Sequence, residues 1–208
     1  MKKRIDSGIY VVIDPAMQET ILINKIKKIS TQNIAAIQIW DNFKNSKNIT
    51  QLIEKISAIC SPKNIPVLIN NRWELLINNH LDGVHFDEIP KDFEKIKSKI
   101  NRDFIIGLTC ENNLKSVEWA NKKSIDYISF CSMFPSSSAG SCEIVNFKTV
   151  EKARKIFDKP LFLSGGISPE KIKDLKELSY DGIAVISGIM NAENPTKAII
   201  EYQQNLNN

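Results

Sequence analysis

The chain has 208 residues, 42% of them hydrophobic and 25% charged, a composition typical of a folded protein with an apolar core. Its formal net charge is only +4, and its lysines lie in segments with helical periodicity rather than in a basic stripe, which argues against a nucleic-acid partner. No run of 18 apolar residues occurs, so we expect no membrane partner and a cytoplasmic protein.

Short apolar runs rich in Ile and Val recur along the chain, and each is followed by a longer segment whose apolar residues recur at steps of three and four. The first pattern predicts buried strands and the second predicts amphipathic helices. The predicted strands are residues 9–13, 35–39, 67–69, 83–86, 104–108, 127–130, 161–164 and 182–186. The main predicted helices are residues 22–30, 49–59, 72–81, 114–123, 147–157 and 195–204.

Strands that alternate with helices predict an α/β protein with a parallel sheet buried on both faces. Eight such units without a long linker favour a single (β/α)8 TIM barrel, and we expect residues 1–208 to form this one domain. The alternative is an open, doubly wound sheet. Its dinucleotide fingerprint, G-x-G-x-x-G, is missing after the first strand, where the chain reads IDPAMQ.

Two loops that contain glycine follow the seventh and eighth predicted strands. The first reads SGGIS (164–168) and the second reads ISGIM (186–190). Glycine lets backbone N–H groups come close to a ligand, and Ser168 followed by Pro169 is typical of a helix N-terminus. Barrels commonly hold phosphate at these two loops, so the sequence predicts a phosphate site there. The alternative is that the glycines only turn two tight corners.

Seven segments, in this order and spacing, resemble the thiamine phosphate synthase and TenI family. They read GIYVVIDP, IAAIQIWDN, VLINNRWELLINNHLDGVHFDE, FIIGLTCEN, DYISFCSMFPSSS, PLFLSGGISPEKI and DGIAVISGIMNAENP. The resemblance spans nearly the whole chain and implies a (β/α)8 barrel that acts in thiamine biosynthesis on a small phosphorylated heterocycle. The synthases are transferases that join a pyrimidine pyrophosphate to a thiazole phosphate with magnesium, and the TenI branch includes thiazole phosphate tautomerases.

The resemblance also implies roles for individual residues. It places the thiazole phosphate on Gly165, Gly166, Ser187 and Gly188, and it places Thr109 where the synthases have a serine. Further substrate-binding positions implied by the matching motifs, or by their place at the predicted barrel mouth, are Gln38, Trp40, Asn70, Arg72, Ser136 and Ser138. The alternatives are that Arg72 pairs with Asp41 or Glu88, and that Trp40 only fills the space of a missing arginine.

The residues that hold the pyrophosphate in the synthases are largely replaced. The Gln-Leu-Arg-Glu-Lys motif is QIWDN here, so both of its cations are missing, and Asn71 stands in place of a metal-binding carboxylate. A magnesium site would therefore depend on Asp87 or Glu88, and we expect no other metal or cofactor. Because leaving-group charge must be neutralised, these changes predict weak coupling activity.

Three residues are candidates for proton transfer: His85, Thr109 and Cys110. A histidine at the barrel mouth can move protons near neutral pH, although His85 can equally have a packing role. Cys110 follows a strand on the catalytic side, and the alternative is a small buried side chain. Three functions stay open: an unusual synthase, a TenI-like tautomerase, or a non-catalytic protein that binds a phosphorylated ligand. Monomer and homodimer are both compatible with the sequence.

Overall fold

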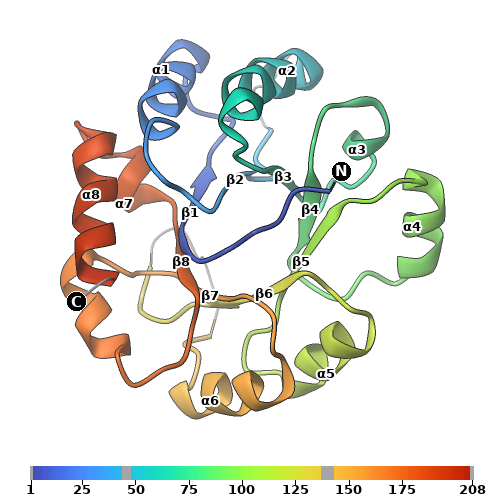
Figure 1. The fold of residues 1–208 in the computed structure, drawn as a ribbon, viewed down its shortest axis with the longest axis vertical. Helices are drawn as coiled ribbons and strands as arrows, with labels where there is room; N and C mark the ends of the chain where they lie inside the picture. The colour runs from blue at the N-terminus through green and yellow to red at the C-terminus, as the bar shows by residue number, and fades with distance from the viewer. Residues whose placement is uncertain (1, 44–47, 137–142, 207–208) are drawn as a thin grey trace.

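The computed structural model describes residues 2–43, 48–136 and 143–206. Within these residues, eight parallel strands pair in chain order, and the last pairs with the first to close a barrel (Figure 1). The fold is therefore the predicted single (β/α)8 TIM barrel. The strands are β1 (Gly8–Ile13), β2 (Ala36–Ile39), β3 (Val67–Asn70), β4 (Gly83–Phe86), β5 (Ile105–Thr109), β6 (Tyr127–Cys131), β7 (Leu161–Ser164) and β8 (Gly182–Val185).

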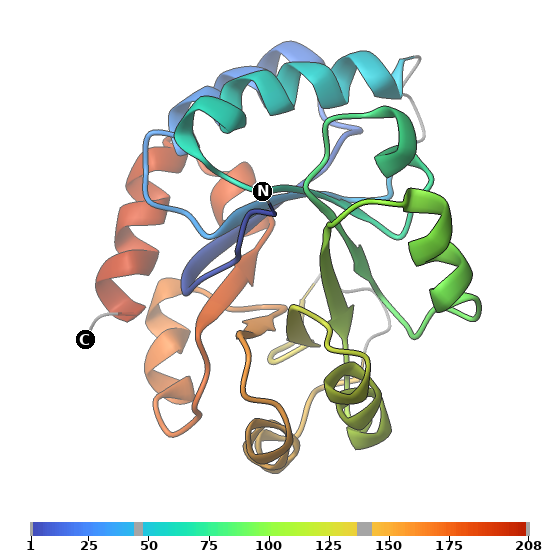
Figure 2. The same ribbon diagram turned by 45° about the vertical axis from the view of Figure 1, so that its right-hand side comes forward.

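The helices lie outside the ring of strands in both views of the ribbon (Figures 1 and 2). The α-helices are α1 (Glu19–Ile29), α2 (Ile49–Cys60), α3 (Leu75–Asn78), α4 (Phe93–Ile100), α5 (Leu114–Lys122), α6 (Phe147–Ile156), α7 (Ser187–Met190) and α8 (Pro195–Leu206). Two 3-10 helices are η1 (Ser61–Lys63) and η2 (Pro169–Leu175). No helix of the described residues is long and apolar enough to cross a membrane.

Each predicted strand overlaps an observed one, but two predicted helical segments differ from the structure. The segment 72–81 forms only the short α3, because tight turns at Arg72 and Trp73 precede it and an extended Asn79 ends it. The amphipathic segment after the glycine pair is the 3-10 helix η2, and Ser168 makes no side-chain cap bond. Its hydroxyl bonds instead to Glu170, which lowers the pKa of that carboxyl group.

The strands bury both faces, because alternate residues point toward the helices and toward the barrel interior. On β1, Ile9, Val11 and Ile13 belong to the layer shared with the helices, whereas Tyr10 and Val12 point inward. The interior is filled by Tyr10, Leu68, Ile105, Tyr127 and Phe162, among others. This interior packing leaves no space for a ligand midway along the barrel axis.

The first residues of the chain cross one end of the barrel before β1 begins (Figure 1). Lys2 pairs with Asp126 at 2.7 Å and Lys3 with Asp82 at 3.1 Å, and Ile5 is buried between these contacts and the barrel interior. The N-terminal segment thus covers the middle of this end of the barrel.

Candidate functional site

A cavity of about 500 Å³ lies at the carboxyl ends of the strands. It is lined by the loops after β7 and β8 and by inward-pointing residues of the other strands. Ten of the residues predicted for the site line it together: Gln38, Trp40, Asn70, His85, Thr109, Ser136, Gly165, Gly166, Ser187 and Gly188. Ser138 lies outside the described residues.

The loop after β7 requires both of its glycines. Gly165 has φ +85° and Gly166 has φ +66°, which is the left-handed region that side chains disfavour. A Cβ atom at Gly165 would overlap the Ser132 hydroxyl, and one at Gly166 would lie 2.5 Å from the Pro135 carbonyl oxygen. The chain can therefore follow this path only with glycine at both positions.

Tyr202 of α8 contacts both glycine loops. The Tyr202 hydroxyl donates to the Ile167 carbonyl at 2.9 Å, and a Cβ atom at Gly188 would overlap the same hydroxyl. Among the described residues, the backbone N–H groups of Gly166 and Gly188 have no acceptor. They are free to bind an anion, and the short α7 and η2 add little dipole to this backbone site.

His85 lies deep in the cavity and bonds to hydroxyl groups on both sides. Its Nδ1 atom is 2.8 Å from the Tyr127 oxygen, and its Nε2 atom is 2.9 Å from Thr109 Oγ1. Burial lowers the pKa of His85 to about 4, against a weaker, opposite effect of the Asp87 carboxylate. The imidazole is therefore neutral near pH 7, and its two partners are side chains rather than backbone carbonyls.

The mouth of β3 and β4 is held together by amide to carboxylate bonds. Asp87 accepts from Asn70 Nδ2 at 2.9 Å and from Asn71 Nδ2 at 2.8 Å, and its backbone N–H donates to Asn71 Oδ1 at 3.0 Å. The described residues contain no group of three or more His, Cys, Asp or Glu that could hold a metal, and Glu88 does not line the cavity. Magnesium prefers several carboxylate or phosphate oxygens, so this donor set does not fit it.

Two other predicted residues lie away from the cavity. Arg72 is exposed, 3.6 Å from Asp41 and 5.8 Å from the centre of the Phe43 ring. Cys110 is buried outside the cavity lining, and burial raises the pKa of its thiol to about 12. The thiol is thus protonated near pH 7 and out of reach of a ligand.

Several cavity residues that belong to strands were not predicted from the sequence. Tyr10, Tyr127 and Ser129 all line the cavity, and Tyr10 and Tyr127 are fully buried. A signal for Tyr127 and Ser129 was present, because hydroxyl groups two positions apart on the otherwise apolar β6 point to the same face of the sheet. Cys131, at the end of β6, also lines the cavity.

Comparisons with known proteins agree with this architecture. The family model described as thiamine monophosphate synthase matches residues 9–189. The thiamine-phosphate synthase of Methanobrevibacter smithii is 27% identical over 191 residues, covering 92% of this chain and 91% of that protein. The enzyme of the same name from Clostridium botulinum is 27% identical over 208 residues, covering 98% and 96%.

A solved structure gives the same fold. The thiamine phosphate pyrophosphorylase of Pyrococcus furiosus superposes with a TM-score of 0.82 at 22% identity, covering 96% of this chain and 95% of that one. The family model covers most of the chain and includes both glycine loops of the cavity. The chain therefore belongs to the thiamine monophosphate synthase family.

Proposed function

We propose that the protein binds a thiazole phosphate, or thiamine phosphate itself, with the phosphate on the loops after β7 and β8. The observation that carries this proposal is the pair of glycine loops, which line the same cavity and whose Gly166 and Gly188 N–H groups have no acceptor among the described residues. Backbone N–H groups clustered in this way form a good site for a dianion. Enzymes of this family act in thiamine biosynthesis, which makes the thiazole phosphate the matching ligand.

The remainder of the cavity suits a flat heterocycle. Val12, Phe162 and Ile186 supply apolar surface next to the glycine loops, and Trp40 adds an aromatic ring. Polar groups of Gln38 and Thr109 lie deeper in the same cavity. A mostly apolar pocket with a few fixed polar groups is the usual form of a small-molecule site.

Coupling of a pyrimidine pyrophosphate to the thiazole, the reaction of the synthase branch, is expected to be slow in this protein. No described residue that lines the cavity is Lys or Arg, and Asp87 is engaged by two amides. Removing one hydrogen-bond donor from an oxyanion hole raises the activation free energy by roughly 3 to 4 kcal/mol, and we expect each missing contact to the departing pyrophosphate to have a similar effect. The protein would then be an unusual transferase of low activity.

A second candidate function is proton transfer on the bound thiazole phosphate, as in a tautomerase. The observation that favours it is a neutral imidazole beside a hydroxyl group inside the cavity: His85 Nε2 lies 2.9 Å from Thr109 Oγ1. Such a pair can pass a proton without a metal ion. The carboxylate of Glu111 also lines the cavity.

Three measurements test these proposals. Calorimetry should detect binding of the thiazole phosphate, and a protein that fails to bind it overturns the first proposal. A coupling assay with both substrates and magnesium should give turnover well below about 1 per second, the lower end of typical enzymes. Deuterium incorporation into the thiazole phosphate separates a tautomerase from a non-catalytic binding protein, because only the enzyme accelerates the exchange.

A further inference from the structure

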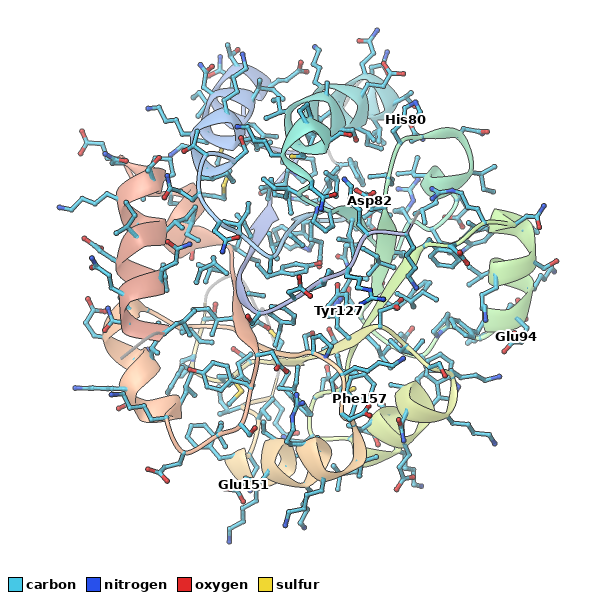
Figure 3. All side chains as sticks on the ribbon, viewed as in Figure 1. His80, Asp82, Glu94, Tyr127, Glu151 and Phe157 are labelled. Atoms are coloured by element: carbon cyan, nitrogen blue, oxygen red, sulfur yellow. The ribbon has the colours of Figure 1, made fainter. Side chains whose placement is uncertain are left out.

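A continuous chain of side-chain hydrogen bonds runs along the inner wall of the cavity, from β2 to β5. The Tyr10 hydroxyl donates to Gln38 Oε1 at 2.8 Å and lies 2.8 Å from the Tyr127 hydroxyl. Tyr127 in turn contacts His85 Nδ1 at 2.8 Å, and His85 Nε2 contacts Thr109 Oγ1 at 2.9 Å. Figure 3 shows Tyr127, the middle residue of this chain, inside the ring of strands.

The Gln38 amide oxygen, which faces the Tyr10 hydroxyl, and the number of protons in the chain together fix its direction. Tyr10 has one hydroxyl proton, which it gives to Gln38, so Tyr127 must donate to the Tyr10 oxygen. The Tyr127 oxygen is then an acceptor for the Nδ1 proton of His85. A neutral imidazole has only one such proton, so Nε2 is an acceptor, and its nearest hydroxyl donor is Thr109 at 2.9 Å, with Ser129 farther away at 3.5 Å.

We propose that Tyr10 and Tyr127 are positioning residues that hold the single proton of His85 on Nδ1, so that the Thr109 hydroxyl donates to Nε2 and its oxygen accepts from the ligand. Thr109 does not specify this tautomer, because its hydroxyl can donate or accept, and neither does Ser129, whose hydroxyl lies 3.5 Å from His85 Nε2 and 3.2 Å from Thr109 Oγ1. The part of the inference that concerns the ligand rests on the proposed function, and the part that concerns the tautomer does not.

The packing around Tyr127 supports a fixed direction. A Cβ atom at Gly107 would overlap the Tyr127 phenol, so glycine on the neighbouring strand makes room for this ring. The His85 and Tyr127 rings are stacked at 5.5 Å, and Phe162 contacts Tyr127 edge-on at 5.7 Å. Tyr10 and Tyr127 are only 2% and 1% exposed. Their hydroxyl groups are therefore largely shielded from bulk water.

The test is nuclear magnetic resonance of the unliganded protein with ¹⁵N-labelled histidine. A protonated and an unprotonated ring nitrogen give well-separated signals, so the spectrum identifies the tautomer directly. The chain has two histidines, and the His80→Gln variant, at an exposed position, assigns the His85 signals. We expect protonated Nδ1 and unprotonated Nε2 in His85. The opposite pattern would overturn the proposal.

The decisive variant is Tyr10→Phe, which changes a residue whose hydroxyl does not bond to His85. Without the Tyr10 oxygen, the Tyr127 hydroxyl donates to His85 Nδ1, and the imidazole proton moves to Nε2. Gln38→Leu should invert the tautomer in the same way and replaces the first variant if that one fails to fold. Tyr180→Phe is the matched control, since this tyrosine lines a different pocket. An unchanged tautomer in Tyr10→Phe would refute the positioning role.

A kinetic readout connects the tautomer to the ligand. In Tyr10→Phe, the rate constant kcat for proton exchange on the thiazole phosphate should fall about tenfold, the effect of one hydrogen bond, while KM stays within about twofold. A general structural defect would change both constants and the melting temperature. If the wild-type protein binds no thiazole phosphate, the proposed function fails while the tautomer result stands. If the tautomer inverts and kcat does not change, the role toward the ligand is refuted.

Discussion

The two ends of the cavity differ in the groups that line them: backbone at one end and side chains at the other. At the loops after β7 and β8, the cavity is lined by backbone, and glycine is required by positive φ angles at Gly165 and Gly166. At the mouths of β2 to β4, side chains face one another, with the Asp87 carboxylate bound by two asparagine amides and Arg72 facing Asp41. A backbone site depends on a few glycines, whereas a side-chain site can lose its charges one residue at a time.

The largest effect should follow from blocking the backbone end. Gly166→Ala places a Cβ atom 2.5 Å from the Pro135 carbonyl oxygen at a position with φ +66°, so the loop must move. Loss of two charge-assisted hydrogen bonds, each contributing about 1.5 to 3 kcal/mol, should weaken thiazole phosphate binding about 1000-fold. Titration calorimetry measures this change.

Two further variants make the result specific. Gly188→Val should have a similar effect through the overlap with Tyr202, whereas Gly8→Ala is the matched control. Gly8 also has a positive φ, but a Cβ atom there meets nothing within 4 Å and lies at the other end of the barrel. Normal affinity in both Gly166→Ala and Gly188→Val would mean that the phosphate binds elsewhere.

A smaller effect concerns the histidine between the two ends. Burial lowers the pKa of His85 to about 4, whereas an unfolded histidine titrates near about 6.5. Between these pH values the unfolded chain binds more protons, so this contribution is fully present above pH 6.5 and is lost as the pH falls toward 4. The loss should reach about 3 kcal/mol, on the order of 1.4 kcal/mol for each pKa unit. Urea unfolding at several pH values measures it.

Other groups titrate in the same pH range, so a pair of histidine variants isolates this contribution. His85→Gln should flatten the dependence of the unfolding free energy between pH 6.5 and 4, although it also lowers the stability at pH 7. His80→Gln changes an exposed histidine and should leave the curve as in the wild type. Equal slopes in the wild type and His85→Gln would contradict a buried, neutral imidazole.

The same contrast explains how much could be predicted from the sequence. The barrel was predicted because its strands are apolar on both faces, a pattern that short segments carry by themselves. The glycine loops were predicted because their residue types report backbone geometry. The hydrogen bond between Tyr10 and Tyr127 joins residues separated by 117 positions, and only the closed register of the barrel brings them together.

Local context also decided where the predictions were wrong. The short α3 and the 3-10 helix η2 have helical periodicity in the sequence, but backbone turns and competing side-chain bonds limit them. The sequence could not decide whether Arg72 faces a ligand or a carboxylate, because this depends on which loops the fold places next to it. In the structure it faces Asp41, on the outside of the cavity.

The smallest expected effect is that of magnesium on phosphate binding. Backbone donors need no metal, and Asp87 already has two amide partners. About 5 mM magnesium, a concentration above the usual dissociation constants of divalent-cation sites, should therefore change the thiazole phosphate affinity less than about twofold. Asn71→Asp provides the positive control, because it places a second carboxylate beside Asp87 in place of an amide donor. In that variant, magnesium should raise the melting temperature.

The pH dependence of binding separates the two ends further. A phosphate monoester gains its second negative charge near pH ~6, and the dianion is the better acceptor for clustered N–H groups. Affinity should therefore be several-fold weaker at pH 5 than at pH 8, with or without magnesium, since residues 164–168 and 186–190 carry no titrating side chain. Calorimetry at both pH values, each with magnesium or with a chelator, measures these affinities. A strong magnesium requirement in the wild type would mean that Asp87 or Glu88 binds metal once the ligand is present. The end of the cavity near β3 and β4 would then retain the chemistry of the synthase.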